Sequence, residues 1–351
     1  MSHDRRPMSS NLFTARLLRT SASGFAAMAA SRVVERSADP ESSDFDMWQA
    51  HFQSSVLELA AAVDDGGEAQ FARRIGWFSK AFTSRGMASD ALRVGLDELH
   101  AVLEESMPTD SWAPLPRFFE AASAELAHPS ADVRAGTEEQ AELTAAYLAQ
   151  IRAGDSAKAI ELVVDALRTD RLIPEEALVS VVSNASRQIG ELWHSAEINV
   201  AEEHFATMTT GRLLEQLLLL SPKPTANGRS VMLTMVEGDA HDLGLRVVAA
   251  LFELNGWRTI CLGANTPAAD LAAMTQSYQP DLLVIGATLN TQREAVGATI
   301  EVVKACRSEQ LVLVGGPAFS SLEGRGQELG ADECALDPRD ALRRGNELLG
   351  V

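Results

Sequence analysis

The sequence predicts two all-α parts followed by a C-terminal α/β domain on a doubly wound parallel sheet. Three observations support this prediction. Apolar residues recur at helical spacing through residues 44–127 and again through 137–220. After residue 229, short β-branched or Leu-rich runs alternate with helical patterns, which is typical of an open parallel sheet. A chain of 351 residues has room for two or three such domains.

The net charge of the chain, -19, excludes several classes of partner. An acidic surface repels phosphate groups, so we expect neither direct DNA binding nor binding to an anionic membrane. No apolar run reaches the roughly 18 residues that a membrane span needs. The three cysteines, Cys261, Cys306 and Cys334, lack the close spacing of a zinc site, and their odd number argues against a disulfide framework. The sequence therefore predicts a reducing, cytoplasmic compartment.

Residues 1–43 differ from the rest of the chain in composition. The first 40 residues carry six arginines against three acidic residues, and serine is frequent. A transit peptide has a similar composition, but a flexible or partly helical tail is the simpler interpretation, and we expect one here.

Residues 44–130 are expected to form an acidic helical domain with a sensory or interaction role. Helical apolar spacing runs through this block, and Gly66-Gly67, Gly86 and Pro108 interrupt it. Its tryptophans are expected in the core of the domain; they are Trp48, Trp77 and Trp112.

Residues 137–221 are expected to form a four-helix bundle. The helical pattern falls into four segments joined by short loops, which favours antiparallel packing. Pro174 suits a first helical turn, and Asn199 with Glu202 has the spacing of a capping box. The expected segments are 137–152, 155–169, 174–194 and 200–220.

Residues 229–351 are expected to form a flavodoxin-like, Rossmann-like domain. Five short runs suit strands, and helical patterns of 10 to 18 residues separate the first four of them. The expected strands are 231–236, 257–262, 282–286, 311–314 and 332–336. Ligands of such sheets bind at the carboxyl ends of the strands, so the loops that follow the strands hold the candidate site.

The loop after the first expected strand contains a histidine with a carboxylate two residues before it. The segment reads Glu237-Gly238-Asp239-Ala240-His241-Asp242-Leu243-Gly244 and runs into a helix. Asp239 can accept the proton of one ring nitrogen of His241, an arrangement that fixes the tautomer of a metal-bound imidazole and raises its basicity. Gly244 removes a side chain where a ligand approaches the backbone.

Small residues follow two further strands. Gly286-Ala287-Thr288-Leu289 comes after the third expected strand, and Gly315-Gly316 comes after the fourth. Small residues on neighbouring strand ends predict a slot between the sheet and its helices, wide enough for the tail of a long cofactor.

This set resembles the cobalamin-binding domain shared by methionine synthase, mutases and corrinoid carrier proteins. The family pattern is Asp-x-His-x-x-Gly, then Ser-x-Leu, then Gly-Gly. Ala287 departs from it at the usual serine, which is expected to weaken one hydrogen bond but to leave the slot. The resemblance implies that His241 replaces the cofactor's own base below the cobalt. It also implies that the nucleotide tail runs past Gly244, Gly286 and Gly316, with Asp242, Leu243, Thr288, Leu289 and Gly315 lining the same site.

The bundle contains a second motif, Trp193-His194, then eight residues, then Glu203-His204. Val200, Glu203 and His204 share one helical face. The spacing resembles the cap of CarH-type photoreceptors, which use adenosylcobalamin. The resemblance implies that Trp193, Val200, Glu203 and His204 hold the adenosyl group. It also implies that His194 ligates cobalt once light has cleaved the cobalt–carbon bond, and that the protein is a homo-oligomer in the dark.

The resemblance covers residues 137–351 and leaves the N-terminal block outside. That block lacks the DNA-binding module of CarH-type repressors, so we expect a light signal to pass to a protein partner. It bears a weak similarity to the globin-like domains of photocobilins, which bind biliverdin, so a bilin is one alternative for this domain. His51 and His100 are the only histidines of residues 44–127, and each suits a surface position.

Other functions stay open at this point. A corrinoid carrier for a methyltransferase would bind the same cofactor without photochemistry. A mutase subunit is disfavoured because no substrate barrel is present. A protein-interaction scaffold with a vestigial slot is the third alternative. The sequence therefore favours a light sensor over an enzyme.

Overall fold

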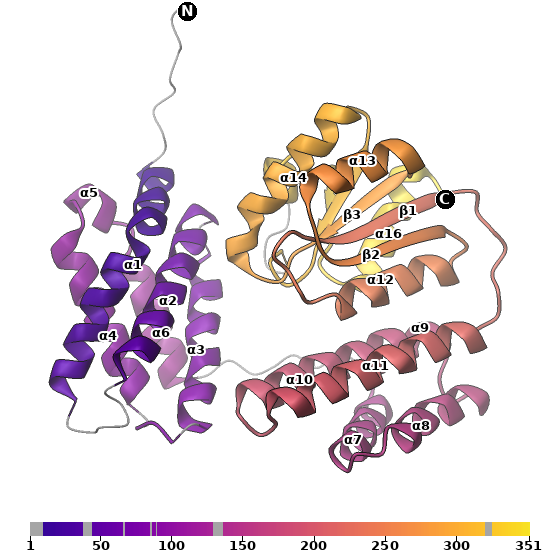
Figure 1. Ribbon diagram of the computed structural model, residues 1–351, viewed down its shortest axis with the longest axis horizontal. Helices are drawn as coiled ribbons and strands as arrows, with labels where there is room; N and C mark the ends of the chain where they lie inside the picture. The colour runs from indigo at the N-terminus through magenta and orange to yellow at the C-terminus, as the bar shows by residue number, and fades with distance from the viewer. Residues whose placement is uncertain are drawn as a thin grey trace, which may run out of the picture. The chain divides into compact units, whose positions relative to one another are not determined.

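The computed structural model describes residues 10–37, 44–65, 67–84, 86–88, 90–128, 136–319 and 325–351. The chain divides into two compact units (Figure 1). The first unit comprises Met1–Asp132 with the short segment His194–Glu197, and the second comprises Val133–Trp193 and Ile198–Val351. Each unit is described below by itself.

The first unit is built from helices. Their bounds are α1 (Ser10–Arg36), α2 (Phe45–Asp65), α3 (Glu68–Ser84), α4 (Ala91–Ser106), α5 (Thr109–Trp112) and α6 (Pro116–Ala127). They share one apolar core. Trp48 lies fully buried in that core as expected, whereas Trp77 and Trp112 are half-buried.

The sequence predicted a flexible or partly helical tail, and helix α1 shows residues 10–36 as a helix that packs into the core of the first unit. One side of it is buried against the rest of the unit through small and apolar residues, namely Ala15, Leu18, Ala22, Phe25, Ala26, Ala29, Ala30 and Val33. Alanine side chains let two helices approach closely while adding little to the hydropathy of the segment. Residues 1–9 and 38–43 of the expected tail lie outside the described residues.

His51 lies inside the first unit, which corrects the expectation of a surface position. Its ring contacts four aromatic side chains, those of Trp48, Phe52, Phe78 and Phe82. Only 9% of the residue is exposed. Burial, with a smaller effect of the nearby Arg74 charge, lowers the pKa of His51 to about 4, so the imidazole is neutral at pH 7.

The helices of the central region share a second apolar core. Their bounds are α7 (Glu138–Arg152), α8 (Ser156–Arg168), α9 (Pro174–Glu176), a π-helical stretch (Ala177–Val182), α10 (Ser183–His194) and α11 (Val200–Leu220). Pro174 occupies the first turn of α9, and Asn199 forms the expected capping box with Glu202. The π-helical stretch was not expected; the Ser183 hydroxyl donates to the Leu178 carbonyl oxygen beside it.

The C-terminal region forms a five-stranded parallel sheet in the order β2-β1-β3-β4-β5. This order is that of flavodoxin-like folds and places the switch point between β1 and β3. The strands are β1 (Ser230–Val236), β2 (Arg258–Thr266), β3 (Leu282–Gly286), β4 (Leu311–Gly315) and β5 (Glu333–Cys334). The parallel sheet predicted from the sequence is confirmed.

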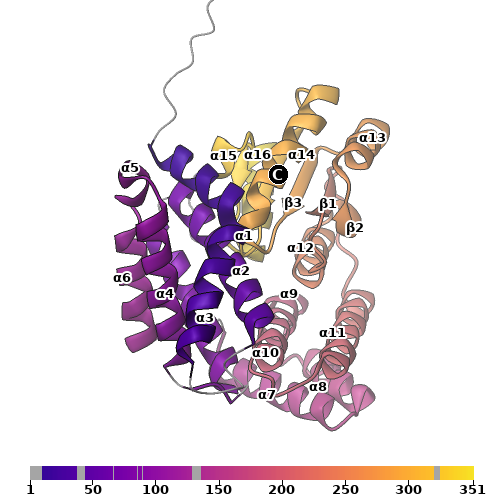
Figure 2. The same cartoon turned by 60° about the vertical axis from the view of Figure 1, so that its left-hand side comes forward.

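Helices cover both faces of the sheet (Figures 1 and 2). α13 (Ala268–Tyr278) and α14 (Arg293–Cys306) pack on one face, and α12 (Leu243–Leu254) and α16 (Pro338–Leu349) pack on the other. The loop between β1 and α12 therefore lies at the carboxyl edge of the sheet, where the sequence places the candidate site. No helix within the described ranges is long and apolar enough to cross a membrane.

Candidate cofactor site

The loop between β1 and α12 holds His241 in one orientation through Asp239. The carboxylate of Asp239 is fully buried, and its Oδ1 lies 2.9 Å from His241 Nδ1 and 3.0 Å from the His241 backbone nitrogen. An ionised carboxylate only accepts hydrogen bonds, so Nδ1 carries the proton and donates it. Nε2 then keeps its lone pair, on a side chain that is 68% exposed. This is the tautomer that a metal ligand requires.

The second carboxylate oxygen of Asp239 is held by the loop after β3. Oδ2 accepts a hydrogen bond of 2.7 Å from the backbone N–H of Thr288. The Gln292 side chain accepts from the N–H groups of Thr288 and Leu289 and thereby holds that loop. Ala287 cannot supply the hydroxyl of the usual serine, yet both oxygens of Asp239 are hydrogen bonded.

Hydrogen bonding and burial act in opposite directions on the two ionisable groups. Burial disfavours the Asp239 carboxylate, but the hydrogen bonds from His241 and Thr288 outweigh it and lower its pKa. The hydrogen bond to Asp239 raises the pKa of His241 against a smaller effect of burial. The charges of Asp239 and Glu203 raise it further. The pair therefore gives His241 a basic, electron-rich imidazole.

Asn265 is a residue of the site that sequence reasoning missed. It lies near the end of β2, and its side-chain oxygen accepts from the Gly238 N–H at 2.7 Å. Its own backbone N–H donates to the Asp239 carbonyl oxygen at 2.9 Å. Asn265 has a φ of 53°, and asparagine tolerates this left-handed conformation better than most residues. That preference, at a strand end after Gly263, was the available signal.

The glycines of the expected slot have different surroundings. A Cβ on Gly244 would meet nothing within 4 Å, so this position is open to a ligand. A Cβ on Gly286 would lie 2.5 Å from Met235 Sδ, and one on Gly316 would lie 2.5 Å from the Ala287 carbonyl oxygen. The last two glycines thus permit packing within the chain itself. Of these three glycines, Gly244 is the one that leaves open space beside the backbone for a ligand.

The predicted upper-face residues of the cap lie at the start of α11. Val200 is 53% exposed, and Trp193 on α10 is 41% exposed. Glu203 accepts a hydrogen bond of 2.6 Å from the Thr207 hydroxyl and lies 3.7 Å from His204 Nε2. The charge of Glu203 is among the effects that raise the pKa of His241, so the start of α11 lies within electrostatic range of the His241 loop.

His194 is placed differently from the other cap residues. It belongs to the first unit, where its ring stacks on Trp77 and is 5% exposed. Its Nε2 lies 2.7 Å from the Trp77 carbonyl oxygen. A carbonyl only accepts hydrogen bonds, so Nε2 of His194 carries a proton, whereas Nε2 of His241 does not. The role of His194 as a cobalt ligand stays a prediction.

The donor set suits a metal that arrives with most of its own ligands. Among the described residues, no group of three or more His, Cys, Asp or Glu side chains could hold a metal ion. A single imidazole binds a free ion weakly, but it completes the coordination of a metal already held in a macrocycle. His241 with the open position at Gly244 therefore fits a cobalt corrinoid.

Comparisons with known proteins agree with this site. Residues 229–344 match a family model described as B12 binding domain, and residues 143–218 match a second model with the same description. A corrinoid protein of Desulfitobacterium hafniense is 29% identical over 171 residues, which cover 46% of this chain and 77% of that protein. The HTH-type transcriptional repressor CarH of Myxococcus xanthus is 27% identical over 247 residues, which cover 69% and 78%.

A solved structure, that of the Methanosarcina barkeri monomethylamine corrinoid protein, is 20% identical with a TM-score of 0.49 and covers 59% of this chain and 96% of that one. The sheet, the histidine loop and the two matched B12-binding domains define the class: this is a cobalamin-binding protein. Corrinoid proteins and CarH-type repressors are both among its relatives.

Replacing Asp239 with asparagine is expected to weaken cobalamin binding by about 10- to 100-fold, because the charge that makes His241 basic is lost. Titration of the apoprotein with aquocobalamin, followed by absorption, measures the effect. Asp281→Asn is the matched control, since Asp281 is hydrogen bonded to Ser230 at the start of β1, away from the carboxyl ends of the strands. Equal affinities of the two variants would contradict the role given to Asp239.

Proposed function

We propose that this cobalamin-binding protein is a light sensor that uses adenosylcobalamin, with His241 below the cobalt, and that it is not an enzyme. The observation that carries the proposal is the carboxylate of Glu203 at the start of α11, whose charge raises the pKa of His241. A sensor of this kind requires the cap face with Val200, Glu203 and His204 to lie above the lower ligand, and the reach of the Glu203 charge to His241 supports that arrangement. The extent of the CarH repressor match, 69% of the chain, supports it further.

The cap residues would hold the adenosyl group. Trp193 and Val200 are apolar and exposed, so they offer a contact surface for a flat base. Glu203 and His204 supply acceptors and donors for its amino and hydroxyl groups. When bound, adenosylcobalamin supplies a cobalt–carbon bond that light cleaves.

His194 is the residue that would change partner. It donates from Nε2 to the Trp77 carbonyl oxygen. To ligate cobalt through that nitrogen, His194 must give up the proton and this hydrogen bond. The resulting bis-histidine state would change the conformation of the first unit. It would thereby change the assembly of the dark homo-oligomer and the signal to a protein partner. A two-state element biased by a local chemical event behaves in this way.

The first unit would pass the light signal to a protein partner. We propose in addition that this unit binds a bilin as a second chromophore. The aromatic cluster around His51 and the guanidinium of Arg74 over the Trp77 and Phe78 rings supply the side chains that a bilin with propionate groups would contact. A red absorption band after addition of biliverdin would support a bilin, and its absence would exclude one.

A corrinoid carrier for a methyltransferase is the second candidate. It is favoured by the match to the corrinoid protein of Desulfitobacterium hafniense. The carrier uses the same lower site, so His241 and Asp239 do not discriminate between the two functions. The cap residues do.

The sensor is tested by absorption spectra of the adenosylcobalamin-loaded protein before and after green light, with size-exclusion chromatography of both samples. We expect a shift to a bis-histidine spectrum and a change of oligomeric state. His194→Ala should bind the cofactor in the dark but lose the stable illuminated spectrum. No change under light, together with methyl transfer when a methyltransferase is added, would establish the carrier instead.

A further inference from the structure

Helix α12, which begins two residues after His241, belongs to two cores at once. Leu243, Val247 and Leu251 are buried in the core of the helical cap. Leu245 and Phe252 are buried in the core beneath the sheet. The loop that carries His241 therefore continues directly into the element that joins the cap to the sheet.

Polar contacts join both ends of α12 to the helices of the cap. Near its start, Arg246 Nη2 lies 2.9 Å from Glu215 Oε1 and 3.5 Å from the Gly211 carbonyl oxygen, both on α11. At its end, Asn255 Nδ2 donates to Glu175 Oε1 on α9 at 2.9 Å. Apolar contacts of α12 with the cap lie between the Arg246–Glu215 pair and the Asn255–Glu175 hydrogen bond.

Gly211 leaves space beside the backbone of α11 for the guanidinium of Arg246. Glycine inside a helix costs about 1 kcal/mol relative to alanine, so its presence in the middle of α11 needs a reason. A Cβ at this position would lie 2.9 Å from Arg246 Nη1. The missing side chain leaves room for the guanidinium to rest on the backbone of α11.

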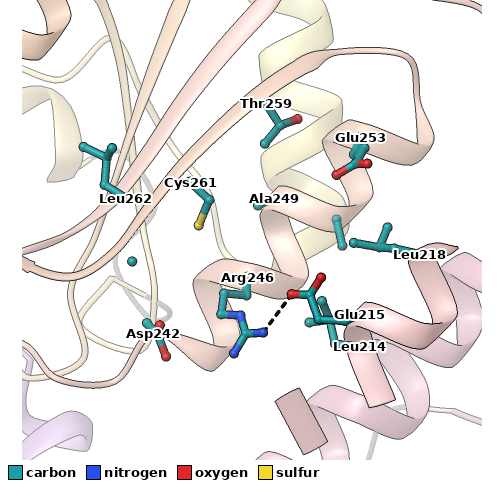
Figure 3. Close-up of a pocket in the computed structure, with 12 residues that line it drawn as sticks. Leu214, Glu215, Leu218, Asp242, Arg246, Ala249, Glu253, Thr259, Cys261 and Leu262 are labelled. Atoms are coloured by element: carbon teal, nitrogen blue, oxygen red, sulfur yellow. Dashed lines mark hydrogen bonds and ion pairs between the residues drawn. The ribbon is translucent and has the colours of Figure 1, made fainter. Parts of the chain in front are cut away.

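A pocket of about 390 Å³ adjoins the ion pair (Figure 3). Its walls come from α11, α12 and β2, and include Leu214 and Leu218 of the cap and Cys261 of the sheet. Figure 3 shows Arg246 and Glu215 pointing toward one another across the seam between α11 and α12. Side-chain packing does not close the seam here, so water reaches the ion pair and the pair can open.

We propose that Arg246 is a positioning residue, which holds α11 in register with the His241 loop, and that the Arg246–Glu215 pair opens when the cap moves. The inference rests on the proposed function in one respect, namely that cobalamin lies between that loop and the start of α11. Because Glu203 is on the same helix as Gly211 and Glu215, a shift of α11 at Arg246 changes the distance from Glu203 to His241. Arg246 thus sets the access of ligands to the upper face of the cobalt.

The first test needs no cofactor. Hydrogen exchange of the α11 and α12 amides is measured in the apoprotein for Arg246→Gln, Glu215→Gln and the double variant. We expect each single variant to raise exchange by about 1.5- to 5-fold, the range for a partly exposed ion pair, and the double variant to add no more. Arg343→Gln, which breaks the ion pairs of Arg343 with Asp340 and Glu347 within α16, is the control and should leave this exchange unchanged.

Gly211→Ala separates positioning from simple stability. Alanine improves the helix but displaces the guanidinium without removing a charge. We expect this variant to raise exchange across the seam, whereas a merely structural role of Gly211 would lower it. Raising the ionic strength from about 0.01 M to about 1 M, which shortens the Debye length from ~30 to ~3 Å, should bring the unmodified protein to the level of Arg246→Gln.

The second test follows cyanide binding to the protein loaded with aquocobalamin. The same variants should accelerate the replacement of the water on the upper face of the cobalt by cyanide, by a similar factor. Additive effects in the double variant, an equal effect of Arg343→Gln, or unchanged exchange in Arg246→Gln would each overturn the inference. A protein that takes up no cobalamin would overturn the proposed function alone, since the apoprotein measurement still decides the role of Arg246.

Discussion

Replacing His241 with alanine is expected to lower the affinity for aquocobalamin by more than about 100-fold, because removal of a metal ligand exceeds the 10- to 100-fold cost of losing a residue that orients it. Any cofactor still bound should keep its own dimethylbenzimidazole on the cobalt and show the corresponding spectrum. The loop should stay folded, since the hydrogen bond that the Thr288 N–H donates to Asp239 Oδ2 and the Asn265 contacts do not involve the imidazole.

His128→Ala is the control for this substitution. His128 is an exposed histidine at the end of α6, so its loss should leave the affinity unchanged. Isothermal titration of the three apoproteins with aquocobalamin gives the comparison. If His241→Ala bound the cofactor as tightly as the unmodified protein and with the same spectrum, another residue would be the lower ligand.

Acidification is expected to destabilise the first unit through His51. Burial lowers the pKa of His51 from 6.5 to about 4, so between these pH values the unfolded chain binds the proton and the folded chain does not. The stabilising contribution is complete above pH 6.5 and is lost as the pH falls towards 4. A shift of this size corresponds to about 3 kcal/mol.

Urea unfolding at a series of pH values across this window measures the effect. His51→Leu removes the titrating group, and its free energy of unfolding should depend on pH more weakly by the same amount. His51→Phe provides a second variant should leucine pack poorly among the rings. Identical pH slopes for His51→Leu and the unmodified protein would show that the imidazole is accessible to protons in the folded state.

The sheet and the lower site were predictable because their signals are local. The alternation of strands and helices predicted the parallel sheet, and the two-residue spacing of Asp239 and His241 predicted their hydrogen bond. The capping box of Asn199 and Glu202 was equally readable. The partners that complete the site were not, because Asn265 near the end of β2 and Gln292 in the 3-10 turn after β3 are distant in the sequence and meet the His241 loop only after folding.

Helix α1 shows why composition misled. Its buried side is mostly alanine, which contributes little hydropathy, and its arginines and serines favoured a tail over a packed helix. In the structure, Arg19 pairs with Asp64, Arg32 with Glu105 and Arg36 with Glu98. These arginines therefore neutralise acidic side chains of the helices that follow. The π-helical stretch was missed because one extra residue in a helical turn leaves the apolar periodicity almost unchanged.

The most direct measurement of the central claim is the electron paramagnetic resonance spectrum of cob(II)alamin bound to protein labelled with nitrogen-15 in its histidines. An axial nitrogen-15 splits each cobalt line into a doublet, whereas the unlabelled nitrogen of dimethylbenzimidazole splits it into a triplet. With Nε2 of His241 below the cobalt, the labelled protein should give doublets, and His241→Ala should not. Triplets from the labelled protein would show that the cofactor keeps its own base and would contradict the account.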